Sequence, residues 1–205
     1  MIWEIWIGAL VLYALFCLWY FNTKVPLTAE EIDKYVMATQ SRLPEADPDD
    51  IRKFLEKDDG REFIMQNMLS LHEGKVAHPQ SGDLTSPRQL LQLYFQPFMK
   101  SILKRAGHPV HQTVRLGGRI DAWNCGKDQG YQVWAMVRYR SRRDFMISVT
   151  TTNFAHLHVF KQAAIAMTEA YPTNMQMSLF MRPHKAIALI LLLIASLMQN
   201  FTFIL

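Results

Sequence analysis

Long uncharged runs of hydrophobic residues mark both ends of this 205-residue chain. Residues 5–21 contain no charged side chain, and residues 186–205 form a second run without charge. A helix needs about 20 predominantly apolar residues to cross the hydrocarbon layer of a bilayer. Both runs approach that length, so the pattern predicts membrane-spanning helices at residues 1–23 and 183–205.

The first run lacks the features of a cleaved secretory signal. Such a signal has a basic start and a small-residue cleavage site, whereas the only early charge here is Glu4 and the run ends in the bulky residues 18–21. Trp3 and Trp6 lie near one end and Trp19 near the other, as interfacial aromatic residues do. These features favour a retained anchor. For the second run the alternative is a buried core helix, but little else in the chain is large enough to surround it.

Basic residues beside the two spans set the expected orientation. Lys24 follows the first run, and Arg182, His184 and Lys185 precede the second. Because basic residues collect on the cytoplasmic side of a span, both groups place the intervening domain in the cytoplasm. We therefore expect a two-pass protein of the inner (cytoplasmic) membrane, with membrane lipid as a partner.

Two short amphipathic helices should form a helical linker at residues 24–60. Thr28 and Glu31 have the spacing of a capping box. Asp47 precedes Pro48 and further acidic residues, a pattern typical of a helix start.

The remaining region, residues 61–182, mixes strand and helix patterns. We expect four strands, at residues 63–71, 110–124, 131–139 and 175–181.

Helices should separate these strands. Ser86 opens one helix, in which Pro97 should cause a kink or a split. Ser141 caps a second helical region, and a third is expected from an N-cap at Asn153 to about Ala170.

The resulting order is β-α-β-β-α-β, the arrangement of a ferredoxin-like α+β domain. Helices cover one face of such a sheet, and the other face must be buried elsewhere. A second sheet from a twin subunit would form a dimeric α+β barrel, so we expect a homodimer.

Three segments carry a resemblance to a known family. Residues 63–74, FIMQNMLSLHEG, follow Asp-Asp-Gly-Arg at 58–61 and resemble the opening strand of small dimeric α+β barrel proteins of the DUF1330 kind. Residues 117–123, GGRIDAW, resemble the Gly-Gly-Arg strand of that group, and residues 137–165 resemble its Val-Arg-Tyr-Pro-Ser-Arg turn and final helix.

The resemblance spans about residues 28–181 and implies a fold more than a function. Arg140 stands where the pattern prefers Pro, and Lys161 where it tends to Arg. Similar barrels include cofactor-free monooxygenases, small isomerases, haem-handling enzymes and ligand-binding proteins, and fold likeness alone does not choose among them.

Charge and cysteine content narrow the classes of partner. The net charge of +4 comes partly from the arginines at 138, 140, 142 and 143. We interpret this run as a solvated strand end, or as attraction to anionic headgroups, and expect no nucleic-acid partner. Cys17 and Cys125 are too few for a disulfide framework or a metal set, so we predict no metal and no cofactor.

Five residues are candidates for ligand binding: Asn67, Trp123, Trp134, Arg138 and His158. Asn67 interrupts an apolar strand, so it either orients a ligand or bonds to neighbouring backbone. Trp123 and Trp134, expected on adjacent strands, either line a pocket or form core.

Arg138 and His158 leave similar alternatives open. Arg138 with Arg119 has the chemistry to bind a carboxylate, or these arginines pair across the sheet with Asp121 or Glu73. His158 shares a helix face with Lys161 and is either an acid–base group or a hydrogen-bonding surface residue.

No phosphate-loop, nucleophile-elbow, CxxC or HExxH motif is present. Three functions therefore remain open. The domain binds a small hydrophobic molecule at the membrane; it is an accessory subunit docked on other membrane proteins; or it is a cofactor-independent enzyme, monooxygenase- or isomerase-like, acting on an apolar substrate. Whether the chain is catalytic is left undecided by the sequence.

Overall fold

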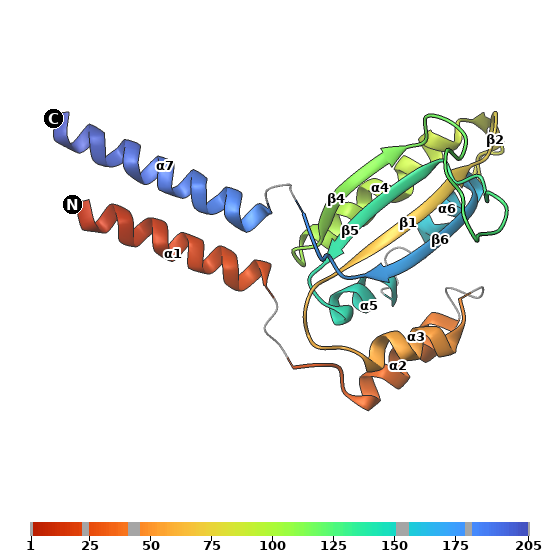
Figure 1. Cartoon of the computed structure of the whole chain (residues 1–205), viewed down its shortest axis with the longest axis horizontal. Coiled ribbons are helices and arrows are strands. Elements are labelled where there is room, and N and C mark those ends of the chain that lie inside the picture. Colours follow the sequence, from red (N-terminus) through yellow and green to blue (C-terminus); the bar gives the residue numbers. More distant parts are fainter. Residues whose placement is uncertain (1, 22–24, 41–45, 151–155, 179–181, 205) are drawn as a thin grey trace. The chain divides into compact units, whose positions relative to one another are not determined.

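A computed structural model describes residues 2–21, 25–40, 46–150, 156–178 and 182–204 of the chain. Two compact units make it up (Figure 1). One combines the two ends, residues 1–22 and 175–205, and the other comprises residues 23–174. Seven helices and a four-stranded antiparallel sheet make the fold a mixed α+β one in the described residues.

The terminal unit consists of α1 (Ile2–Tyr20) and α7 (Pro183–Ile204), which pack side by side. Trp6 Nε1 donates a hydrogen bond to Gln199 Oε1 at 2.8 Å. Both helices are long and apolar enough to cross a membrane by length and composition. Their large apolar side chains are mostly exposed, as in Leu10 (66%) and Leu193 (62%). Apolar helices that do not bury their side chains in protein need another apolar environment.

The second unit begins with α2 (Ala29–Gln40) and α3 (Pro48–Glu56). Both predicted helix starts are confirmed. The Thr28 amide donates to the Glu31 carboxylate at 2.9 Å and the Glu31 amide to Thr28 Oγ1 at 3.2 Å, which completes a capping box. Asp47 accepts from the Asp49 amide at 2.8 Å.

The sheet has the strand order β4-β5-β1-β6, and every neighbouring pair is antiparallel. Its strands are β4 (His108–Val114), β5 (Val133–Tyr139), β1 (Phe63–Leu71) and β6 (Ile165–Thr173). Two-residue strands β2 (Val76–Ala77) and β3 (Leu84–Thr85) form a separate hairpin. The predicted strand at 63–71 is confirmed, and the one at 131–139 begins two residues later than predicted.

The prediction for the last strand is wrong. The strand forms at 165–173, so it overlaps the end of the helix predicted to run to about Ala170, and residues 175–178 of the predicted strand have no regular structure. The alanine-rich sequence before Tyr171 favours a helix locally. Pairing with β1 outweighs that preference. Pro172, which has no amide hydrogen to donate, is tolerated because β6 is an edge strand and has a neighbouring strand on one side only.

Three helices accompany the sheet: α4 (Pro87–Leu103), α5 (Arg142–Thr150) and α6 (His158–Ala164). Ser141 caps α5 as predicted, accepting from the Asp144 amide at 3.1 Å. The predicted cap at Asn153 lies outside the described residues. Pro97 does not split α4, because residues on both sides of it, Leu90 and Ile102, are held in the core at 1% exposure.

The main core lies between the sheet and α4 and α5. Its buried members are Phe63, Met65, Ile102, Val137 and Tyr139. A second cluster joins α2 and α3 to α5 through Ile32, Val36, Leu55 and Met146. The predicted linker at 24–60 is therefore packed into the same unit as the sheet.

Candidate functional site

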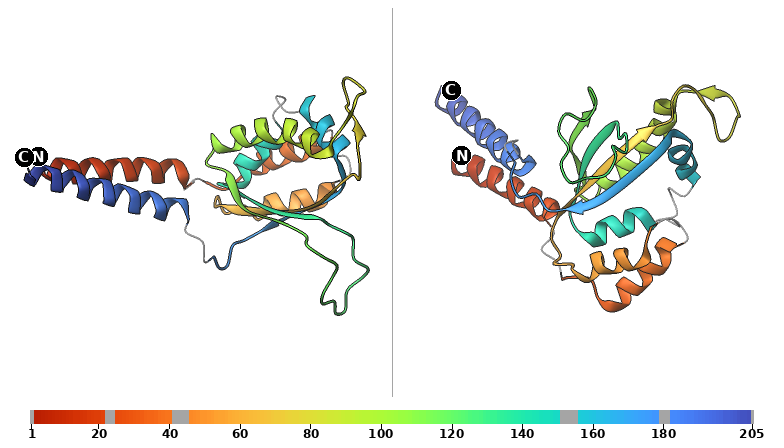
Figure 2. Two further views of the ribbon diagram at one scale, coloured as in Figure 1. Left: turned by 90° about the horizontal axis from the view of Figure 1, so that it is seen from above. Right: turned by 45° about the vertical axis from the view of Figure 1, so that its right-hand side comes forward.

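The face of the sheet opposite the core is the first candidate surface. Side chains alternate along a strand, so the core positions Phe63 and Met65 on β1 direct the intervening residues the other way. We define the open face by five residues of β1, β5 and β6: Gln66, Met68, Trp134, Met136 and Tyr171. The first four are half-buried, and Tyr171 is exposed. In Figure 2, α4, α5 and α6 lie on the other side of the sheet.

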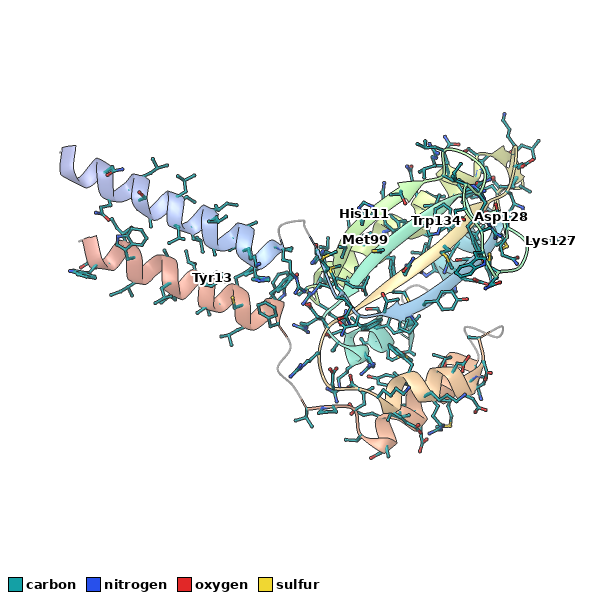
Figure 3. The ribbon with its side chains drawn as sticks, in the orientation of Figure 1. Tyr13, Met99, His111, Lys127, Asp128 and Trp134 are labelled. Atoms are coloured by element: carbon teal, nitrogen blue, oxygen red, sulfur yellow. The ribbon has the colours of Figure 1, made fainter. Side chains whose placement is uncertain are left out.

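An extended segment between β4 and β5 projects from the sheet on the open-face side (Figure 2, left). We call residues 115–132 the arm. Its base closes through a 2.8 Å hydrogen bond from the Arg115 amide to the Gln132 carbonyl. The Arg115 guanidinium pairs with both carboxylate oxygens of Asp128, which is labelled in Figure 3. That pairing lowers the pKa of Asp128 to about 2.

Large apolar side chains on the arm face solvent. Leu116, Ile120 and Trp123 are 102%, 98% and 85% exposed. A monomeric protein seldom exposes several large apolar residues on one segment unless they contact something.

Two predictions about the region of the arm are wrong. The second strand runs from His108 to Val114 and not from 110 to 124, so Trp123 does not lie on a strand beside Trp134. Trp134 lies in the middle of the open face, paired with Met68 and Thr113. Sequence reasoning missed the arm, although its four glycines with Asn124 and Asp128 are a loop signal.

Asn67 bonds to neighbouring backbone. It lies on β1 at a core-facing position, and its Nδ2 donates to the carbonyls of Met65 at 3.2 Å and Ala135 at 3.3 Å. These bonds satisfy the side-chain amide within the sheet. Of the two alternatives for Asn67, they agree with bonding to neighbouring backbone and not with orienting a ligand.

Arg138 is buried to 1% exposure and joins three parts of the fold. Its Nε donates to Glu62 Oε2 at 2.6 Å, and its Nη1 donates to the Ala106 carbonyl at 2.6 Å. The predicted juxtaposition with Arg119 is wrong, because Arg119 lies on the arm and donates to the Gly126 carbonyl. Arg138 forms its ion pair with Glu62, which directly precedes β1.

His158 and Lys161 share a face of α6, as predicted, and both contact Tyr94 of α4. The His158 ring stacks on Tyr94 with centroids 5.5 Å apart, and the Lys161 ammonium lies 5.7 Å from the same ring centroid. Phe98 stacks on Tyr94 at 5.5 Å. His158 and Lys161 thus join α6 to α4 through Tyr94.

Burial shifts the pKa of each ionisable group in this cluster. It lowers the pKa of His158, with a further contribution from the Lys161 charge, and it lowers the pKa of Lys161. It raises the pKa of Tyr94 to about 12. All three groups therefore favour their neutral forms more than in water. Such a cluster occurs at functional sites and in packed interfaces alike, and here the neighbouring Leu90, Phe160 and Ala164 form a packed core.

The described residues hold no group of three or more His, Cys, Asp or Glu side chains placed to bind a metal ion.

Comparison with known proteins gives a likeness of fold. No family model matches the chain, and no curated protein matches it. Among solved structures, the RPA0582 protein of unknown function from Rhodopseudomonas palustris is similar at 16% identity, with a TM-score of 0.51 over 65% of this chain and 96% of that one. The structure of methylated RPA0582 protein matches at 16% identity and a TM-score of 0.50, over 67% of this chain and 94% of that one. At this identity the chain shares the fold of that protein.

Proposed function

We propose that this chain is a membrane-anchored α+β protein that pairs with a second copy through its open face and binds a small apolar molecule between the two sheets. The observation that carries the proposal is the open face itself. Met68, Trp134 and Met136 form its centre and are half-buried, although the helices of this unit pack on the other side. A sheet is stable in water when an apolar face is covered, and a second copy supplies a matching cover.

The sheet topology supports this pairing. The order β4-β5-β1-β6 with antiparallel neighbours is the one that a ferredoxin-like β-α-β-β-α-β chain adopts. Two such sheets packed face to face lie about 10 Å apart. The side chains of Trp134 and Tyr171 would then line the space between the sheets. Such a dimer would have the architecture of the dimeric α+β barrels of the DUF1330 kind.

The anchors are α1 and α7. Their exposed apolar surfaces are suited to lipid, and their flanking basic residues Lys24, Arg182 and Lys185 favour a cytoplasmic position for the domain. An apolar ligand partitions into the bilayer, so a binding domain tethered there meets it at high local concentration.

Native mass spectrometry of the full chain in mild detergent tests the proposal, because it reports subunit number and bound small molecules together. We expect a dimer that retains phenylnaphthylamine, used as an apolar probe. Met136→Glu places a charge in the open face and should give a monomer that does not retain the probe. Leu84→Glu, at a residue that is 68% exposed on β3, is the matched control and should leave both unchanged. A dimer that survives Met136→Glu with its probe would contradict the proposal.

The arm favours a second candidate, an accessory subunit of a membrane protein complex. Leu116, Ile120 and Trp123 would then contact another membrane protein. This candidate requires stoichiometric co-purification with such a partner, lost in the triple Ser variant of these residues. A homodimer that is unchanged by the triple variant counts against it.

A further inference from the structure

A separate cavity of about 350 Å³ lies where α3, the start of β1, the start of α5 and the end of β6 meet. It shares no residue with the open face. Phe54, Phe63 and Pro172 give it apolar walls, and Thr173 and Asn174 complete one side. The volume is at the lower end of the range of small-molecule sites, about 300–1,000 Å³.

Positive charge exceeds negative charge around this cavity. Its lining contains the four cations Lys53, Lys57, Arg61 and Arg142 but only two carboxylates, those of Asp59 and Glu62. Glu62 is already engaged, because its Oε2 accepts from the buried Arg138 at 2.6 Å.

Two of the cations have no counter-charge among the described residues. Lys53 Nζ lies 3.4 Å from Asp50 Oδ1, and Arg142 Nη1 lies 3.3 Å from Asp58 Oδ1 and 3.7 Å from Asp59 Oδ1. No hydrogen bond or ion pair of the described residues involves the side chain of Lys57 or that of Arg61. Their charges are therefore available to a ligand.

Arg142 is positioned by the fold and is left incompletely bonded. Its Nη1 donates to the Lys57 carbonyl and to Asp58, and its guanidinium lies 5.0 Å from the Phe54 ring centroid. These contacts hold the side chain in place. Its Nε, in contrast, is buried and has no acceptor within the described part of the chain. A buried donor without an acceptor destabilises a fold, so an acceptor supplied by a ligand would be favourable.

We propose that this cavity binds a small organic anion. Its oxyanion head group is bound by Arg142, Arg61 and Lys57, and its short apolar body packs on Phe54, Phe63 and Pro172. Arginine suits this role because its planar N–H groups match a carboxylate or a phosphate. The ring of Phe54 lies 5.1 Å from that of Phe63, edge to face, which gives the apolar part of the site a rigid wall.

Benzoate titrated into the full chain in a non-ionic detergent tests this proposal, with saturation-transfer NMR as the readout. Benzamide has the same ring and size without the charge, so it reports how much of the binding depends on the oxyanion. We expect saturable binding of benzoate and at least about tenfold weaker binding of benzamide, since hydrogen bonds to a charged group are stronger than those to a neutral one.

The variant Lys57→Gln/Arg61→Gln removes the two available charges. Both residues are exposed, and their side chains make no ion pair or hydrogen bond within the described part of the chain, so the fold should survive, which circular dichroism checks. We expect benzoate affinity to fall about tenfold or more. The matched control Lys75→Gln/Arg88→Gln removes two exposed charges outside the cavity and should leave the affinity unchanged.

The benzoate measurements would overturn the proposal in any of three cases. These are no saturable benzoate binding, equal binding of benzoate and benzamide, and equal loss of affinity in the cavity variant and its control. Competition with inorganic phosphate, which has an oxyanion but no apolar body, tests whether the apolar body of the ligand contributes to binding. If phosphate displaces benzoate at equal concentration, the apolar body contributes nothing and the assignment to an organic anion is wrong. None of these measurements depends on the open face, so failure here is distinguishable from failure of the dimer.

Discussion

Replacing Arg138 by Met should destabilise the domain far more than removing an ion pair on its surface. The guanidinium is 1% exposed and makes two short bonds, to the Glu62 carboxylate and to the Ala106 carbonyl, each at 2.6 Å. Ala106 lies just after α4 and has a left-handed φ of 56°, which is unusual for a non-glycine residue. The hydrogen bond from Arg138 to its carbonyl stabilises this turn.

The magnitude follows from what the substitution leaves behind. Removing one partner of a buried ion pair costs about 3–5 kcal/mol, because the other charge stays uncompensated. The Glu62 side chain is 25% exposed, so water partly solvates the carboxylate and the lower end of that range applies. We expect Arg138→Met to lower the free energy of unfolding by about 3 kcal/mol.

Denaturant unfolding of the full chain in detergent, followed by circular dichroism, measures this loss. Arg52→Met is the matched control. It breaks the 2.7 Å Arg52–Asp33 pair, whose side chains are 41% and 57% exposed, and should cost about 1 kcal/mol or less. Similar losses for the two variants would refute the reasoning. A loss of ligand binding by Arg138→Met at unchanged stability would instead return Arg138 to the ligand-binding role that its sequence position suggested.

Two further predictions concern pH. Hydrogen bonds from Arg143 and from Thr28 lower the pKa of Glu31 to about 2. Its carboxylate therefore stabilises the fold above its usual pKa of about 4.5, and this stability is lost as the pH falls from there toward 2. Glu31→Gln should cost about 1 kcal/mol at pH 7 and much less near pH 2 in unfolding curves; a loss independent of pH would contradict this. Burial, with the charge of Lys161, lowers the pKa of His158. As the pH falls, the imidazole is therefore protonated in the unfolded state before it is protonated in the native state. The native state loses stability as the pH falls below about 6.5. His158→Phe, which keeps a ring on Tyr94, should reduce the fall in melting temperature between pH 7.5 and 5.5, and an unchanged fall would show that His158 is not responsible.

Features that depend on neighbouring residues could be predicted from the sequence. The starts of α2, α3 and α5 follow from Thr28, Asp47 and Ser141, because an N-cap acts within one turn. The apolar composition of α1 and α7 is visible in the same way. The strand at 63–71 was predictable because a continuous apolar run between glycines suits a central strand.

Features that depend on distant residues were decided only by the tertiary structure. Residues 165–170 favour a helix by themselves and form most of β6 because β1 offers a partner about 100 positions earlier in the chain. The same holds for the candidate sites. Arg138 could not be paired with Glu62 from sequence, since the two meet only when β5 lies beside β1. The cavity at Arg142 likewise exists only where four separate segments converge. Caps and hydrophobic runs are local and readable in the chain, whereas strand pairing, buried ion pairs and cavities arise from contacts that the linear order does not specify.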